Sequence, residues 1–146
     1  MNEWIQYPRF VGSLLFFPCI TVLLVALNLE PAAEGIGTHQ QLGLSPCTFW
    51  LLLQTPCPMC GMTTTFTHLA HLQFSEGLLN QPFGVVLFGL MVVCMAIGFI
   101  DLVTGRGVYK KTYQWIRRND ALFSRSLLLG LILGWIYKIC TMQGWL

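Results

Sequence analysis

Long apolar runs alternate with shorter polar stretches along the chain, and three of the runs are long enough to cross a lipid bilayer. They occupy about residues 10–29, 83–104 and 122–143. A helix of about 20 residues rises roughly 30 Å, the thickness of the hydrocarbon core. In the third run, Lys138 lies near the far end, where its long stem is expected to carry the ammonium to the interface.

Composition supports a membrane location for most of the chain. Of its 146 residues, 55% are hydrophobic and only 10% are charged, and the mean hydropathy is +0.64. Soluble domains carry about 25% charged residues. The few basic residues are not interleaved with an exposed aromatic face, which argues against a nucleic-acid partner. We therefore expect an all-α integral membrane protein with three transmembrane helices in a single membrane domain, residues 1–146.

The distribution of charge predicts the orientation. The segment 30–82 has no Lys or Arg, whereas the loop 105–121 is basic. Loops rich in Lys and Arg stay on the cytoplasmic side. The N-terminus and the loop 105–121 are therefore expected inside, and the segment 30–82 and the C-terminus outside. The inner loop reads as a short amphipathic helix lying against anionic lipid headgroups.

The outer segment 30–82 has structure of its own. An irregular stretch precedes an apolar patch at 47–53, which is too short to span a bilayer. A turn rich in proline and glycine follows at 55–61, and a helical run then extends from Met62 to about Phe74. Ser75 can cap one further short turn that ends near Asn80. This pattern predicts an extracytoplasmic two-helix cap, either re-entrant into the outer leaflet or interfacial.

The turn of the outer segment carries the candidate chemistry, Cys57-Pro-Met-Cys60-Gly. Two thiolates at this spacing can bind one tetrahedral ion, and a structural zinc site needs four ligands. Cys47 is the natural third ligand, and a histidine is expected to be the fourth, His39 first and His68 second. We expect the chain to fold back between Cys47 and the turn, so that the three sulfurs converge on one zinc ion.

Two alternatives remain open from the residues themselves. Because Cys57 and Cys60 open a helix, Cys57 would have a lowered pKa and act as a redox nucleophile, with Cys47 as the resolving partner. An oxidising outer compartment suits that chemistry. In the other alternative, the cysteines form a structural disulfide or stay as buried thiols.

The same region resembles a bacterial family of small membrane proteins, catalogued as a domain of unknown function with a Cys-Pro-x-Cys-Gly-x-Thr signature. The resemblance covers roughly residues 37–90. It rests on Gly37-Thr38-His39, Gln41-Leu42-Gly43-Leu44, Pro46-Cys47, Cys57-Pro58-Met59-Cys60-Gly61-Met62-Thr63, and Asn80, Pro82 and Gly84. The resemblance implies residence in a bacterial inner membrane and groups the three cysteines as a set. It implies no activity. Members often carry Arg after the signature's Thr, where this chain has Thr64.

The sequence therefore predicts a multi-pass membrane protein with an outer Cys/His cluster that binds zinc in a structural or accessory role, rather than an enzyme. The alternatives are a thiol–disulfide protein using Cys57, Cys60 and Cys47, and an accessory subunit of a larger membrane complex. The expected partners are the lipid bilayer and, in the last case, other membrane subunits.

Overall fold

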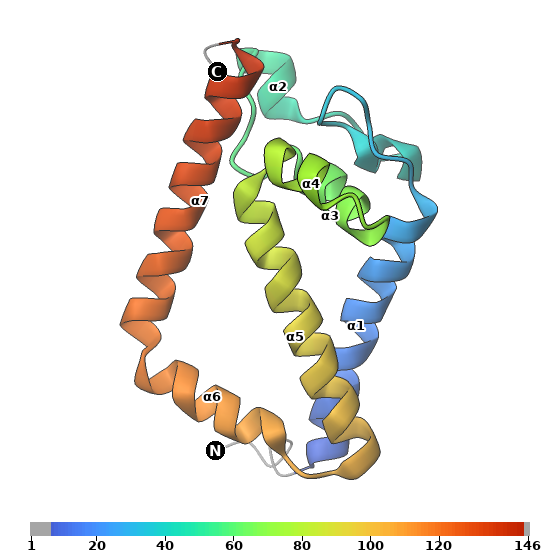
Figure 1. Ribbon diagram of the computed structural model, residues 1–146, viewed down its shortest axis with the longest axis vertical. Coiled ribbons are helices and arrows are strands. Elements are labelled where there is room, and N and C mark those ends of the chain that lie inside the picture. The colour runs from blue at the N-terminus through green and yellow to red at the C-terminus, as the bar shows by residue number, and fades with distance from the viewer. Residues whose placement is uncertain (1–6, 145–146) are drawn as a thin grey trace. The chain divides into compact units, whose positions relative to one another are not determined.

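The computed structural model describes residues 7–144, and all of the regular elements in that range are helical (Figure 1). Three of them are long and apolar enough to cross a membrane: α1 (Pro8–Asn28), α5 (Pro82–Thr104) and α7 (Asp120–Met142). Their ends agree with the predicted spans to within two residues, and α1 continues through Pro18. The prediction of an all-α chain with three helices of membrane-spanning length is confirmed.

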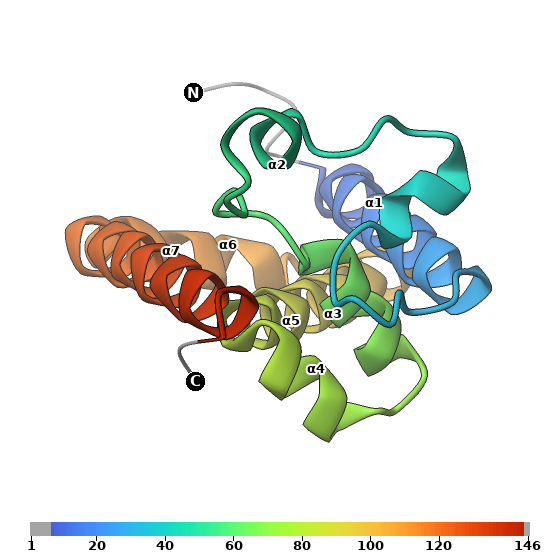
Figure 2. The ribbon, with the colours of Figure 1, turned by 90° about the horizontal axis from the view of Figure 1, so that it is seen from above.

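The shorter helices are η2 (Thr38–Leu42), α2 (Thr48–Leu53), α3 (Met62–Ala70), α4 (Phe74–Asn80) and α6 (Val108–Arg118). The amphipathic helix predicted for the basic loop is α6. The outer segment contains three α-helices and a 3-10 helix, where two helices were predicted. The predicted run from Met62 breaks because Leu72 adopts a left-handed conformation with φ 62°, and the Gln73 N–H donates back to the His68 carbonyl at 2.8 Å. Helices α3 and α4 are therefore separate and pack on each other (Figure 2).

The described residues form two compact units, and each is considered by itself. The first contains the chain up to residue 24 and residues 89–126. In it, α1 and α5 approach closely at two glycines: a Cβ added to Gly98 would lie 2.7 Å from the Phe16 nitrogen. A Cβ added to Gly12 would lie 2.6 Å from the Leu102 nitrogen. Small residues at such positions let two membrane helices pack backbone to backbone.

A buried carboxylate joins α5 to α6 in the same unit. Asp101 is 0% exposed, and its two oxygens accept hydrogen bonds from the backbone N–H groups of Val108 at 2.7 Å and Tyr109 at 2.8 Å. These donors belong to the first turn of α6, which has no carbonyl partners within its own helix. Asp101 therefore caps α6, and this role accounts for a buried acid near the end of an apolar helix.

The second unit, residues 25–88 and the chain from 127 onward, has a core rich in hydroxyl groups. Thr38, Thr64, Thr65 and Thr67 are all 0% exposed. The hydroxyls of Thr38 and Thr64 are hydrogen-bonded at 2.9 Å, and the Ala32 N–H donates to Thr38 Oγ1 at 3.0 Å. Buried hydroxyls need such partners to avoid a desolvation penalty, so the threonines fix how the outer segment folds on itself.

Helix α7 is tied to this segment by three polar side chains. The Trp135 indole donates to the Pro56 carbonyl at 2.8 Å, and the Tyr137 hydroxyl donates to the Leu79 carbonyl at 2.7 Å. Lys138 is only 3% exposed, so the expectation that its ammonium reaches the interface is wrong. Its ammonium stays inside the unit because backbone and amide oxygens of the outer segment accept its hydrogen bonds.

Candidate metal centre

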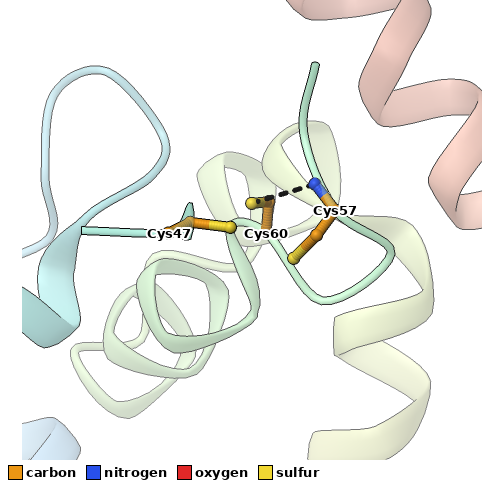
Figure 3. Close-up of side chains that lie close together, drawn as sticks. All are labelled: Cys47, Cys57 and Cys60. Atoms are coloured by element: carbon orange, nitrogen blue, oxygen red, sulfur yellow. Dashed lines mark hydrogen bonds between the residues drawn. The ribbon is translucent and has the colours of Figure 1, made fainter. Parts of the chain in front are cut away.

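The sulfurs of Cys47, Cys57 and Cys60 all lie within 4.8 Å of one another (Figure 3). Thiolates around a single tetrahedral zinc ion, each about 2.3 Å from it, lie roughly 4 Å apart. The predicted convergence of the three cysteines is therefore confirmed. Cys60 is buried and only 7% exposed, whereas Cys47 and Cys57 are partly accessible.

Local backbone geometry brings Cys57 and Cys60 together. The Cys60 N–H donates to the Cys57 carbonyl at 2.9 Å, which closes a tight turn. The Cys57 N–H donates to the Cys60 sulfur at 3.2 Å (Figure 3). Gly61 follows with φ 85°, a conformation that glycine adopts without steric cost, and α3 begins at the next residue.

Cys47 reaches the turn because the intervening chain reverses. It is the N-cap residue of α2, and Gln54 ends that helix in a left-handed conformation with φ 52°. Pro56 is fully buried and is held in place by the hydrogen bond from Trp135. The fold-back at Thr55 and Pro56, on which the predicted convergence depends, is thus fixed by contacts within the unit.

The surroundings of Cys60 and Cys47 shift the pKa values of these two thiols in opposite directions. Burial, together with hydrogen bonding to Cys57, raises the pKa of Cys60 to about 12. Burial also opposes ionisation of Cys47, but hydrogen bonds from the Trp50 backbone and from the thiols of Cys60 and Cys57 outweigh it and lower the pKa of Cys47. Its neighbours thus favour the ionised form of Cys47, whereas a metal ion that binds the Cys60 sulfur must displace the proton held there.

A cavity of about 490 Å³ opens beside the sulfurs. Its walls mix polar and apolar side chains, and they include all three cysteines as well as Glu34, His39, Trp50, Met59 and Thr63. The volume lies in the range of small-ligand pockets. A metal ion on the three sulfurs would therefore have an accessible fourth position.

The two predicted histidine ligands lie in different places, and neither belongs to the close group of ligand atoms found in residues 7–144. His39 lines the cavity beside the cysteines, and its Nε2 donates to the Ser45 carbonyl at 3.2 Å. A histidine that gives one N–H to a carbonyl keeps the other nitrogen as a lone-pair donor, which is the usual state of a metal ligand. His68 lines a separate cavity, and its Nδ1 donates to Gln73 Oε1 at 2.7 Å.

Sequence reasoning missed the polar residues that support the turn. Asn80 Nδ2 donates to the Gly61 carbonyl and to Thr65 Oγ1, both at 3.0 Å. Asn80 therefore ties the residue after Cys60 to α3. In the sequence, Asn80 stands out only through the family resemblance, because asparagine is common at the ends of helices.

Part of the chain matches a known protein family. The search of curated proteins and the search of solved structures each found no match to the chain. The match begins at Cys47 and ends one residue after Cys94, so it contains all three clustered cysteines and the first 14 of the 23 residues of α5. Over residues 47–95 the chain is therefore similar to a family described as protein of unknown function (DUF2752).

Proposed function

We propose that the chain is a multi-pass protein of the bacterial inner membrane whose extracytoplasmic cluster of Cys47, Cys57 and Cys60 binds zinc in a structural or accessory role. The observation that carries the proposal is the approach of three sulfurs to within 4.8 Å of one another. They come from two stretches of the chain separated by a reversal. Thiolate ligands favour thiophilic ions such as zinc over magnesium or calcium.

We assign the fourth ligand to His39, acting through Nδ1. Its Nε2 is engaged by the Ser45 carbonyl, and the side chain lines the same cavity as the sulfurs. The ring lies outside the close group of the three sulfurs, so ligation by His39 requires η2 to move toward the ion. His68 is the weaker candidate, because it lines a different cavity.

The proposed orientation puts the N-terminus and α6 inside and the segment 30–82 outside. It rests on the six basic side chains between Gly105 and Ser126 and on the absence of Lys and Arg from residues 30–82. Lipid is the proposed partner of the spans. We also assign α2 an interfacial position, because its leucines at 51, 52 and 53 are 58%, 76% and 58% exposed.

A thiol–disulfide function is the competing candidate. It is favoured by the position of the Cys47 sulfur within 4.8 Å of two other sulfurs, which also lower the pKa of Cys47. A redox protein needs an accessible thiolate with a nearby sulfur to resolve the mixed disulfide. In that scheme Cys47 would attack first. The raised pKa of Cys60 argues against Cys60 as the attacking thiol.

Chelator-dependent alkylation separates these functions and also tests the orientation. In a chain with Cys19, Cys94 and Cys140 replaced by serine, a membrane-impermeant maleimide applied to intact cells should label the cluster slowly. Labelling should accelerate at least about tenfold after a zinc chelator is added, because metal-bound thiolates are shielded. Fast labelling that the chelator leaves unchanged would favour the redox function.

The matched control for orientation is a cysteine on α6. With all native cysteines replaced by serine, a Lys110→Cys variant should react only after the cells are permeabilised. Labelling of that cysteine from outside would overturn the orientation without affecting the metal proposal.

A further inference from the structure

Lys138 is a buried cation with neutral partners. Its Nζ donates to the Gly35 carbonyl at 3.1 Å, to the Asn80 carbonyl at 3.3 Å and to Asn80 Oδ1 at 2.6 Å. Lys138 lines a cavity of about 540 Å³, and Glu34 and Glu76 line it too. Both glutamates are solvent-exposed, and within residues 7–144 neither forms an ion pair with Lys138. Buried charges in proteins are normally paired with an opposite charge or bound to a metal. We therefore expect a negatively charged group close to this ammonium.

Lys138 is also the one Lys or Arg in the sequence ranges 25–88 and 127–146. An ionisable side chain inside a membrane span is costly and is usually retained for a function. Snorkelling would lower this free-energy cost by bringing the ammonium to water, but the Lys138 side chain is only 3% exposed. A simple structural tie between α7 and the outer segment would not require a charged group.

The ammonium lies directly beside the turn that carries the cysteines. A Cβ added to Gly61, the residue after Cys60, would lie 3.1 Å from both Cε and Nζ of Lys138. Asn80 accepts from Lys138 on one side and donates to the Gly61 carbonyl on the other.

We propose that Lys138, positioned by Asn80, is the counter-charge of the metal–thiolate centre. This inference rests on the proposed metal function. Three thiolates carry a charge of −3, so a divalent ion leaves the centre at −1 and a monovalent ion leaves it at −2. A net anion in surroundings of low dielectric is destabilised unless a cation lies nearby. Lys138 supplies that cation, and the glycine at position 61 leaves room for it.

The test compares ions of different charge on the full-length protein in detergent. Competition with a chromophoric chelator would give the affinities for Zn(II) and Ag(I) in the wild type, in Lys138→Met and in Lys138→Arg. We expect Lys138→Met to lower zinc affinity about 10- to 100-fold, as loss of an outer-shell partner does. Silver affinity should fall by about a further tenfold, because its centre carries one more negative charge. Lys138→Arg should retain most of both affinities.

Two further variants keep the result interpretable. Lys110→Met on α6 removes a distant cation and should change neither affinity. Asn80→Asp keeps the side-chain size and places a carboxylate against the ammonium, so it should also weaken silver binding more than zinc binding, even if Lys138→Met fails to fold. Equal losses for the two ions, or unchanged affinities in folded variants, would overturn the inference. A wild type that binds neither ion would instead refute the metal function itself.

Discussion

Replacing Cys60 by serine is expected to lower zinc affinity more than a hundredfold. Structural zinc sites are stabilised by about 10–16 kcal/mol shared among four ligands, so one thiolate contributes roughly 3 kcal/mol. Cys60 is the most buried of the three sulfurs and accepts the Cys57 N–H, so a serine oxygen there is a poor substitute as a soft ligand. Competition titration against a zinc indicator would measure the loss.

The matched control for that variant is Cys94→Ser, which changes a cysteine on α5 outside the cluster. It should leave zinc affinity at the wild-type value. An identical affinity in Cys60→Ser and Cys94→Ser would mean that the three sulfurs do not act as a set.

Replacing Gly98 by leucine is expected to destabilise the protein by about 3 kcal/mol, near the upper end of the cost of overpacking. The new Cβ would lie 2.7 Å from the Phe16 nitrogen and 2.9 Å from the Gly12 carbonyl oxygen, both on the backbone of α1. Since backbone atoms cannot rotate away, the two helices must separate. Thermal unfolding in detergent should show a midpoint lower by about 10 °C.

Gly89→Leu is the control on the same helix, because a Cβ at that position meets no atom within 4 Å. Its unfolding midpoint should stay within about 2 °C of the wild type, as is usual for substitutions that contact nothing. Equal destabilisation of the two variants would show that the α1–α5 contact does not set the loss, since leucine has a higher helix propensity than glycine.

The spans were predictable because hydropathy alone decides whether a helix can lie in lipid. Their ends were predictable as well, since Pro82 suits a first helical turn and begins α5. The cysteine cluster was predictable from the CxxC spacing and the short distance along the chain to Cys47. These signals are local in sequence, although the fold-back that brings Cys47 to the turn is held by the distant Trp135.

The remaining features depend on contacts between residues far apart in sequence. Leu72 adopts a left-handed conformation that the sequence signals with no glycine, so the run from Met62 was predicted to continue to about Phe74, whereas α3 ends at Ala70. The burial of Lys138 depends on oxygens more than fifty residues away, at Gly35 and Asn80. Nothing in the sequence signals that Asp101, inside the predicted span 83–104, caps the next helix with its carboxylate.

X-ray absorption at the zinc edge of the purified protein tests the central proposal most directly, because it reports the ligands of the bound ion. Coordination by Cys47, Cys57 and Cys60 predicts three sulfur neighbours at about 2.3 Å, and His39 adds one nitrogen at about 2.0–2.1 Å. A first shell of oxygen and nitrogen alone would contradict the proposal, as would a zinc-free protein with two of these cysteines joined in a disulfide.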